Sequence, residues 1–246
     1  MSRHYKHDGL ILPSVTTILS DVSNSSAPLM QWSSNCCIEW VRDYADWVHP
    51  EDNYKLTGFF ILPEQLDDAR FAHKKISKQA LAVGSEVHSA IKEWLTKVKQ
   101  TPLPDSFSDD MVNEFNNAFS AFLKFEKDYK LEPIKTEHKL YGDGFAGTCD
   151  VIAKITIKGE RKVFLLDYKT SKNLFRETRI QTAAYRSMTT CEGNGAVRLC
   201  KKTGLYGFKD YSKSYNSDLI EWYRSIELYF ARHPIVKSKA FAKETV

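Results

Sequence analysis

The clearest pattern of hydrophobic and polar positions in this chain lies between residues 147 and 169. Residues 147–157 alternate apolar and polar side chains, as a half-buried strand does, and residues 163–168 begin as a continuous apolar run, as a buried strand does. Lys158, Gly159 and Glu160 separate the two segments and predict a turn. The sequence therefore predicts a β-hairpin, around which the other elements are arranged.

Helical spacing of apolar residues predicts most of the chain before this hairpin. A short strand over residues 9–12 is followed by Pro13 and Ser14, which predict the start of a short helix with Ser14 as its cap. The longer segments with helical spacing predict helices over residues 28–47, 63–79, 81–98 and 109–129. We expect three tryptophans of the first of these to pack in the core: Trp32, Trp40 and Trp47. Polar segments predict loops over residues 23–27, 49–58 and 100–108.

Strand and helix patterns alternate around and after the hairpin. Residues 131–141 predict a strand, and Gly142-Asp143-Gly144 a tight turn. The remaining segments predict a helix over 173–188, a second hairpin over 196–200 and 205–211, and a last helix over 217–233 with a frayed tail from residue 237. This order predicts an α/β fold, in which helices flank a small mixed central sheet and the N-terminal half is mainly helical.

Three charged residues stand out on the first predicted hairpin. Asp150 lies on its first strand, and Asp167 and Lys169 end its second strand, two residues apart and therefore on one face. Asp167 follows four apolar residues, where a carboxylate is costly to bury unless it is paired or binds a cation. Carboxylates with a neighbouring ammonium group suit metal-assisted hydrolysis of a phosphodiester. An ordinary Asp–Lys pair on a surface hairpin is the alternative.

Four short motifs occur in one order along the chain. They are His88 within GSEVH, Gly147-Thr-Cys-Asp150, Asp167-Tyr-Lys169-Thr170-Ser171, and Gln181 followed four residues later by Tyr185. In this ordered set the sequence resembles the PD-(D/E)xK nuclease superfamily, and within it the RecB-like exonuclease branch. The resemblance covers residues 88–185 and implies a restriction-endonuclease-like core.

The resemblance also implies a role for each of these residues. His88, Asp150, Asp167 and the backbone carbonyl of Tyr168 are expected to hold one or two Mg²⁺ or Mn²⁺ ions, while Asp150, Asp167 and Lys169 carry catalysis. Glu137, on the strand before Asp150, is a further candidate to line the site. Gln181 and Tyr185 lie one helical turn apart and are expected to contact DNA. Gly84 shares the helix face of His88 and leaves room for a strand or substrate to approach closely.

By resemblance, the expected activity is that of a metal-dependent DNA exonuclease acting on DNA ends, with single-stranded ends as one option, in recombination, repair or replication. A single nuclease domain over 1–246 is expected: a mainly helical region over 1–130, a catalytic sheet core over 131–215, and a C-terminal helix and tail over 216–246. The compact chain and the lack of a helicase motif indicate a stand-alone enzyme, and the resemblance implies the kind that phages encode, with a recombination or replication protein as a candidate partner. The alternatives are a catalytically silent DNA-binding scaffold of the same fold and a structure- or sequence-specific endonuclease.

The charge distribution bears on a nucleic-acid partner. The whole chain carries a net charge of only +4, but residues 154–179 hold eight Lys or Arg against three Asp or Glu, a local charge of +5. A patch of this kind is what a phosphate-binding surface needs, and a solvated polar face is the alternative. Lys201 and Lys202, at the tip of the second hairpin, are further candidate phosphate contacts. Stacking on DNA bases is the alternative role for the three tryptophans.

Five cysteines lack the CxxC spacing of a structural zinc site. Some relatives in the RecB-like branch hold an iron–sulfur cluster with three cysteines after the core, where this chain has only Cys191 and Cys200, so no cluster is expected. The first residues contain no apolar run typical of a signal peptide, and no segment approaches a membrane span. Free thiols without an export signal indicate an intracellular, cytoplasmic protein with no membrane partner.

Overall fold

The computed structural model describes residues 4–23, 26–44, 46–48, 58–60 and 63–241. The chain divides into two compact units. The first, called here the sheet unit, comprises Met1–Ser23 and Val83–Val246, and the second, the helical unit, comprises Asn24–Ala82. The predicted division, one domain with regions over 1–130, 131–215 and 216–246, differs from these two units and stays a prediction.

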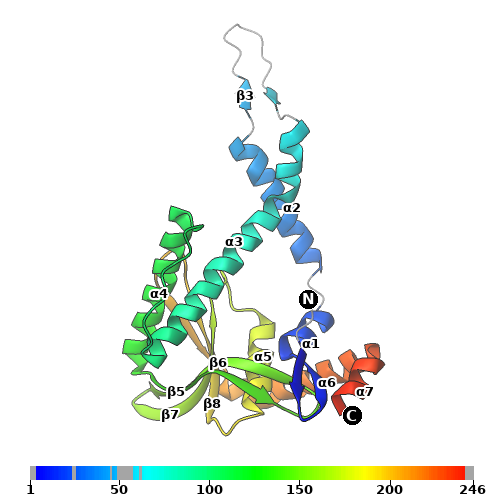
Figure 1. Ribbon diagram of the computed structural model, residues 1–246, viewed down its shortest axis with the longest axis vertical. Helices are drawn as coiled ribbons and strands as arrows, with labels where there is room; N and C mark the ends of the chain where they lie inside the picture. The colour runs from blue at the N-terminus through cyan, green and yellow to red at the C-terminus, as the bar shows by residue number, and fades with distance from the viewer. Residues whose placement is uncertain (1–3, 24–25, 45, 49–57, 61–62, 242–246) are drawn as a thin grey trace. The chain divides into compact units, whose positions relative to one another are not determined.

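A five-stranded mixed sheet forms the centre of the sheet unit, which confirms the α/β class (Figure 1). Its strands lie in chain order: β5 (Glu132–Tyr141), β6 (Ala146–Ile157), β7 (Glu160–Lys169), β8 (Gly193–Leu199) and β9 (Tyr206–Asp210). All neighbours are antiparallel except β7 and β8, which are parallel and joined through helix α5 (Arg176–Arg186). Both predicted hairpins are confirmed, β6–β7 and β8–β9.

One face of the sheet is covered by α4 (Asp109–Tyr129) and by the portion of α3 from Val83 onward, where α3 as a whole spans Pro63–Thr96. Val83, Val87 and Ile91 of α3 and Phe122 and Phe125 of α4 belong to this cluster. The sheet contributes the side chains that alternate onto the same face: Val151, Ala153, Ile155, Phe164, Leu166, Tyr168, Val197 and Leu199. The apolar stripe of α4 therefore packs as predicted, between the limits predicted for this helix.

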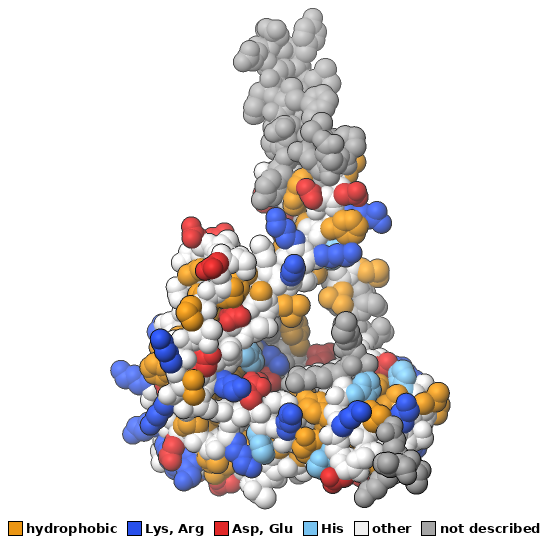
Figure 2. Space-filling view, in the orientation of Figure 1, with side chains coloured by type: hydrophobic (Ala, Val, Ile, Leu, Met, Phe, Trp, Pro, Cys, Tyr) orange, Lys and Arg blue, Asp and Glu red, His pale blue; other side chains and the backbone are white. Residues whose placement is uncertain are grey.

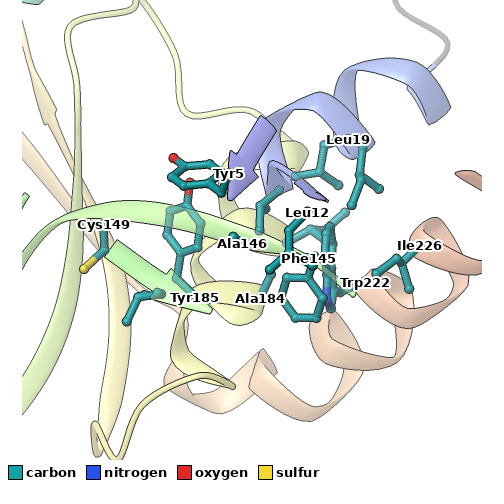
Figure 3. Packing of buried hydrophobic residues seen from close by; sticks show 14 of the residues in the cluster. Tyr5, Leu12, Leu19, Phe145, Ala146, Cys149, Ala184, Tyr185, Trp222 and Ile226 are labelled. Carbon is teal, nitrogen blue, oxygen red and sulfur yellow. The ribbon is translucent and has the colours of Figure 1, made fainter. Parts of the chain in front are cut away.

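The opposite face of the sheet packs against a second cluster, drawn in Figure 3. It gathers α5, α6 (Tyr215–Arg232), α1 (Val15–Val22), α7 (Pro234–Phe241) and the hairpin of β1 (His4–His7) and β2 (Leu10–Pro13). Trp222 of α6 is fully buried and its ring meets Phe145 edge-on at 4.9 Å. The Ser14 hydroxyl accepts a hydrogen bond from the Thr17 amide, so the predicted cap of α1 is confirmed.

Three predictions of element limits are wrong. The helix predicted over 28–47 ends at Tyr44, and Asp46–Val48 is a strand. The helices predicted over 63–79 and 81–98 are one helix, α3, of 34 residues. The junction Gln79-Ala-Leu-Ala consists of strong helix formers, so nothing there ends the helix. The tail predicted to fray from residue 237 is helical to Phe241, because α7 packs on the second cluster and buries Ala240 to 1% exposure.

The helical unit contains α2 (Ser26–Tyr44), a small antiparallel pair of β3 (Asp46–Val48) and β4 (Gly58–Phe60), and the N-terminal portion of α3. Trp32 is 38% exposed, so its predicted core position is wrong, and Trp40 is half-buried. The side chain of Trp47 and most of the predicted loop 49–58 lie outside the described residues. Among the helices of the described residues, none is both long and apolar enough to cross a membrane.

Candidate metal centre

The two strands that carry the predicted aspartates separate at the point where these residues lie. The ladder between β6 and β7 ends at the pair Val151 and Leu166, whereas β6 continues along β5 to Ala146 and β7 continues along β8 to Lys169. Asp150 and Asp167 are the next residues on each side of this fork. Because the β6–β7 ladder has ended, the Tyr168 amide donates its hydrogen bond to a side chain, Asp150 Oδ2, at 2.6 Å. The fork therefore brings Asp150 beside the end of β7.

Tyr168 presents a second group to the fork. The N–H and C=O of one residue in an extended strand lie on the same edge, so the Tyr168 carbonyl faces the side on which its amide meets Asp150. Its side chain points away into the first cluster and is 1% exposed. The backbone carbonyl predicted as a metal ligand thus lies on the edge that carries Asp150.

His88, Glu137 and Asp150 each place a donor atom within 4.8 Å of the others. His88 comes from α3, with Nδ1 at 3.3 Å from Asp150 Oδ1. Glu137 has a backbone φ of 46°, in the left-handed region that few residues other than glycine adopt, and it lies across the β5–β6 register from Asp150. A strained residue in mid-strand is a sign of a functional site. Two carboxylates and an imidazole could together hold a divalent ion: carboxylates suit Mg²⁺ and Mn²⁺, and an imidazole suits transition metals.

A connected set of side chains from β7 and α5 borders this donor set. Asp167 Oδ2 lies 2.8 Å from Lys169 Nζ, which itself donates to Gln181 Oε1 at 3.2 Å. The Gln181 amide group donates to Asp167 Oδ1 at 3.1 Å and to the Tyr185 hydroxyl at 3.3 Å. Asp167 and Gln181 are buried, and the side chain of Lys169 is 29% exposed. The structure therefore brings together the residues of the last two motifs.

The electrostatics of the site follow from the crowding of like and unlike charges. Burial raises the pKa of Asp167 to about 6, against the opposing effect of the Lys169 ammonium. Burial opposes protonation of His88, yet the charge and hydrogen bond of Asp150 outweigh it and raise the His88 pKa to about 9. Burial likewise opposes ionisation of Asp150, but His88 and Lys169 hold the pKa of this carboxyl below its ordinary value. Protonated His88 and Lys169 thus compensate the two aspartates when no ion is bound.

Glycines permit close approaches at two points of the site. A Cβ at Gly84 of α3 would lie 3.1 Å from Thr170 Oγ1, so the predicted close approach is made by the residue that follows Lys169. A Cβ at Gly147 would lie 2.3 Å from Cε1 of Tyr185, whose ring is buried. The glycine of the Gly-x-x-Asp motif therefore makes room for the tyrosine of the last motif, and through Tyr185 and Gln181 it supports Asp167 and Lys169.

We expect Gly147→Ala to lower both stability and any activity of the site. The added methyl overlaps a ring that is packed in the second cluster, as Figure 3 shows for Tyr185, and overpacking of this kind costs about 1–3 kcal/mol. Gly207→Ala is the matched control in the same sheet, since its Cβ would meet Arg198 Nε at 3.5 Å, an ordinary contact. Melting temperature checks the prediction, and equal melting of both variants would contradict it.

The basic stretch predicted around the site is dispersed and largely paired. Lys154, Lys158, Arg161 and Lys162 lie near the turn end of the β6–β7 hairpin, about 20–30 Å along the strands from Lys169. Ion pairs join Arg161 to Glu132, Lys162 to Glu160, Arg176 to Glu221 and Arg179 to Asp218. The local charge of +5 is therefore not one patch at the site, because the strand register separates its members and carboxylates of β5 and α6 pair with Arg161, Arg176 and Arg179.

The tip of the second hairpin lies at the same end of the sheet as the site. Lys169 is in register with Arg198 on parallel strands, and Lys201 follows only three residues later. Lys201 Nζ forms an ion pair with Glu114 Oε2 at 3.0 Å, and its side chain is 15% exposed. Lys202 is exposed. The predicted phosphate contact at this tip therefore depends on Lys202.

Two contacts at the site were missed by sequence reasoning. The Tyr5 hydroxyl lies 3.0 Å from Thr148 Oγ1, so the N-terminal hairpin is tied to the strand of Asp150. Arg198 donates to the carbonyl of Lys172 at 3.0 Å, beside the end of β7. No local sequence pattern predicts either contact, because each joins residues far apart in the sequence.

Comparisons with known proteins add little to this geometry. No protein-family model matches the chain, and no curated protein matches it. A solved structure titled "Crystal structure of SSO0001" is 13% identical, with 65% of this chain and 85% of that chain covered, at a TM-score of 0.29. A likeness at this score carries no argument, so the site must be interpreted from its own residues.

Proposed function

We propose that this chain is a divalent-metal-dependent deoxyribonuclease with a restriction-endonuclease-like core, similar to the RecB-like exonucleases, that acts on DNA ends. One observation carries the proposal: His88, Glu137 and Asp150 converge at the fork where Asp167 and Lys169 also lie. These groups come from four elements, α3, β5, β6 and β7. An ordinary surface Asp–Lys pair would not account for an imidazole and a glutamate with a left-handed backbone at the same place.

The donor atoms fit a hard cation. Asp150, Glu137 and the Tyr168 carbonyl offer oxygen ligands, His88 offers nitrogen, and Asp167 lies next to Asp150 across the fork. A bound Mg²⁺ or Mn²⁺ lowers the pKa of its water and offsets charge on an attacked phosphate.

Lys169 is held in a position suited to catalysis. Its ammonium group is fixed by Asp167 and Gln181, and the partly exposed side chain still faces solvent. A fixed ammonium near the attacked phosphate stabilises the negative charge that develops on it. Gln181 and Tyr185 orient this pair, and because both side chains are buried they offer no surface to a DNA strand. We therefore propose that Gln181 acts on bound DNA indirectly, by positioning Lys169, and not by the direct contact predicted from the sequence.

The test is incubation of the protein with 5′- and 3′-labelled oligonucleotides, single- and double-stranded, with Mg²⁺, Mn²⁺ or Ca²⁺. Progressive shortening from an end in Mg²⁺ or Mn²⁺ supports an exonuclease. Cleavage of a closed circle would instead support an endonuclease. Binding without cleavage in every metal would leave only a DNA-binding scaffold and contradict the proposal.

We expect His88→Ala to lower activity more at limiting than at saturating metal concentration. His88 supplies one ligand among several, so its loss weakens ion binding and is overcome when the ion is in excess. A titration of cleavage rate against Mn²⁺ concentration measures the shift. A loss of equal size at every concentration would contradict the ligand role and indicate a role in catalysis or packing.

A further inference from the structure

One stretch of α3 in the helical unit is basic, although the helix begins with three acidic residues, Glu64, Asp67 and Asp68. Between Ala69 and Ser85 the sequence has four Lys or Arg and no Asp or Glu. These cations are Arg70, Lys74, Lys75 and Lys78, and all four are exposed. Figure 2 shows blue Lys and Arg side chains with hydrophobic side chains between them along the described residues of this region, and red Asp and Glu side chains at its upper end.

This basic face lies opposite the side of α3 that packs inward. Ala69 and Ala72 are buried, and the ring of His73 meets Trp32 of α2 edge-on at 6.3 Å. At about 100° per residue, Arg70, Lys74 and Lys78 fall on the other side of the helix in one row, one turn apart. The row therefore faces away from the contact with α2.

The cations of this face form no ion pair among the described residues, although Asp67 and Asp68 lie less than one turn before Arg70. None of the ion pairs there includes Arg70, Lys74, Lys75 or Lys78. In the sheet unit, by contrast, carboxylates pair with Arg161, Lys162, Arg176, Arg179, Lys201 and Arg232. Surfaces usually intersperse charges of both signs, so an unpaired row of one sign attracts a polyanion.

An aromatic ring lies within the row. Phe71 is 39% exposed, and its ring centroid is 4.3 Å from Lys74 Nζ and 5.2 Å from the Arg70 guanidinium carbon. An exposed ring flanked by cations is the usual platform for single-stranded nucleic acid, since bases stack on the ring while phosphates meet the cations. A helix that binds a lipid surface needs one wide apolar face, whereas the exposed large apolar side chains of this portion of α3 are distributed around the helix: Leu66, Phe71, Ile76 and Leu81.

We propose that Arg70, Phe71, Lys74 and Lys78 form a second binding site, specific for single-stranded DNA and separate from the metal centre. This inference rests on the proposed action of this chain on DNA. It extends that proposal by stating which form of DNA, the single strand, the helical unit binds. It predicts that the free single strand at a DNA end, and not the duplex, is what the helical unit recognises.

The test compares the full chain with Arg70→Gln/Lys74→Gln/Lys78→Gln. The matched control, Lys92→Gln/Lys127→Gln/Lys239→Gln, removes the same charge from exposed lysines of the sheet unit. Anisotropy of a labelled oligothymidine in Ca²⁺ gives the binding constant over a series of salt concentrations. Because each phosphate contact on a single strand contributes about 0.7 to the slope of log K against log salt, the triple variant should lower the slope by about two. The control should leave it unchanged.

Two further measurements keep the outcome decisive. Phe71→Ala should weaken binding about tenfold at constant slope through lost stacking, and Leu81→Ala should not. Equal slopes for parent, triple variant and control would overturn the site. Binding to phosphatidylserine vesicles is measured in parallel, and a triple variant that lost vesicle binding but kept DNA binding would also overturn it. Binding does not require cleavage, so a protein that shows these slopes and cleaves in no metal would refute the nuclease proposal alone.

Discussion

Asp150→Asn and Asp167→Asn are each expected to abolish Mg²⁺-dependent cleavage while the fold remains intact. Asp150 contacts His88, lies within reach of Glu137 and accepts a hydrogen bond from the Tyr168 amide at the fork. Asp167 fixes Lys169 and faces Asp150 across the same fork. An amide keeps the shape of each side chain but removes the charged oxygen that a hard ion needs.

Binding of the ion gives a second measurement that does not depend on turnover. An ion that binds only the folded protein raises its melting temperature. We expect Mn²⁺ to raise the melting temperature of the parent and to leave the melting temperature of each variant unchanged. Asp105→Asn, in an exposed loop, is the matched control and should keep both the increase and the activity. Full Mg²⁺-dependent turnover in either site variant would refute the site.

Lys169→Ala is expected to bind DNA nearly as well as the parent in Ca²⁺ but to cleave it about a hundredfold or more slowly in Mg²⁺, the effect of losing one electrostatic stabiliser. Asp167 and Gln181 hold the ammonium in place before substrate arrives. Its charge matters most when the phosphate gains negative charge in the transition state. A contact confined to that state lowers turnover without weakening substrate binding.

Two lysines outside this arrangement serve as controls for Lys169. Lys172 follows it in an exposed loop, and Lys202 is exposed at the tip of the β8–β9 hairpin. Substitution of either by alanine should at most weaken binding and its salt dependence, with turnover at saturating DNA preserved. If Lys169→Ala lost binding in proportion to activity, Lys169 would belong to a basic binding surface, and its proposed catalytic role would be refuted.

The sequence by itself determined the elements whose patterns are local. The alternation over residues 147–157 and the apolar run before Asp167 are enough to specify two strands, and a two-residue side-chain period then puts Asp167 and Lys169 on one face. The limits of α4 follow from a cap at Ser108 and a regular stripe of phenylalanines, both of which lie within one segment. The order and spacing of the motifs that contain His88, Asp150, Asp167, Lys169, Gln181 and Tyr185 are likewise properties of the sequence alone.

Only the tertiary structure decided which of these residues meet and which charges stay free. Glu137 reaches Asp150 and His88 through a left-handed backbone that no residue pattern indicates. Gly147 admits Tyr185 because β6 and α5 pack there. The basic stretch 154–179 is divided by the hairpin register and paired by remote carboxylates, while the row on α3 keeps its charges unpaired among the residues that the structure describes. The physical reason is common to all three: contacts between remote segments depend on packing and register, which composition and local periodicity do not encode.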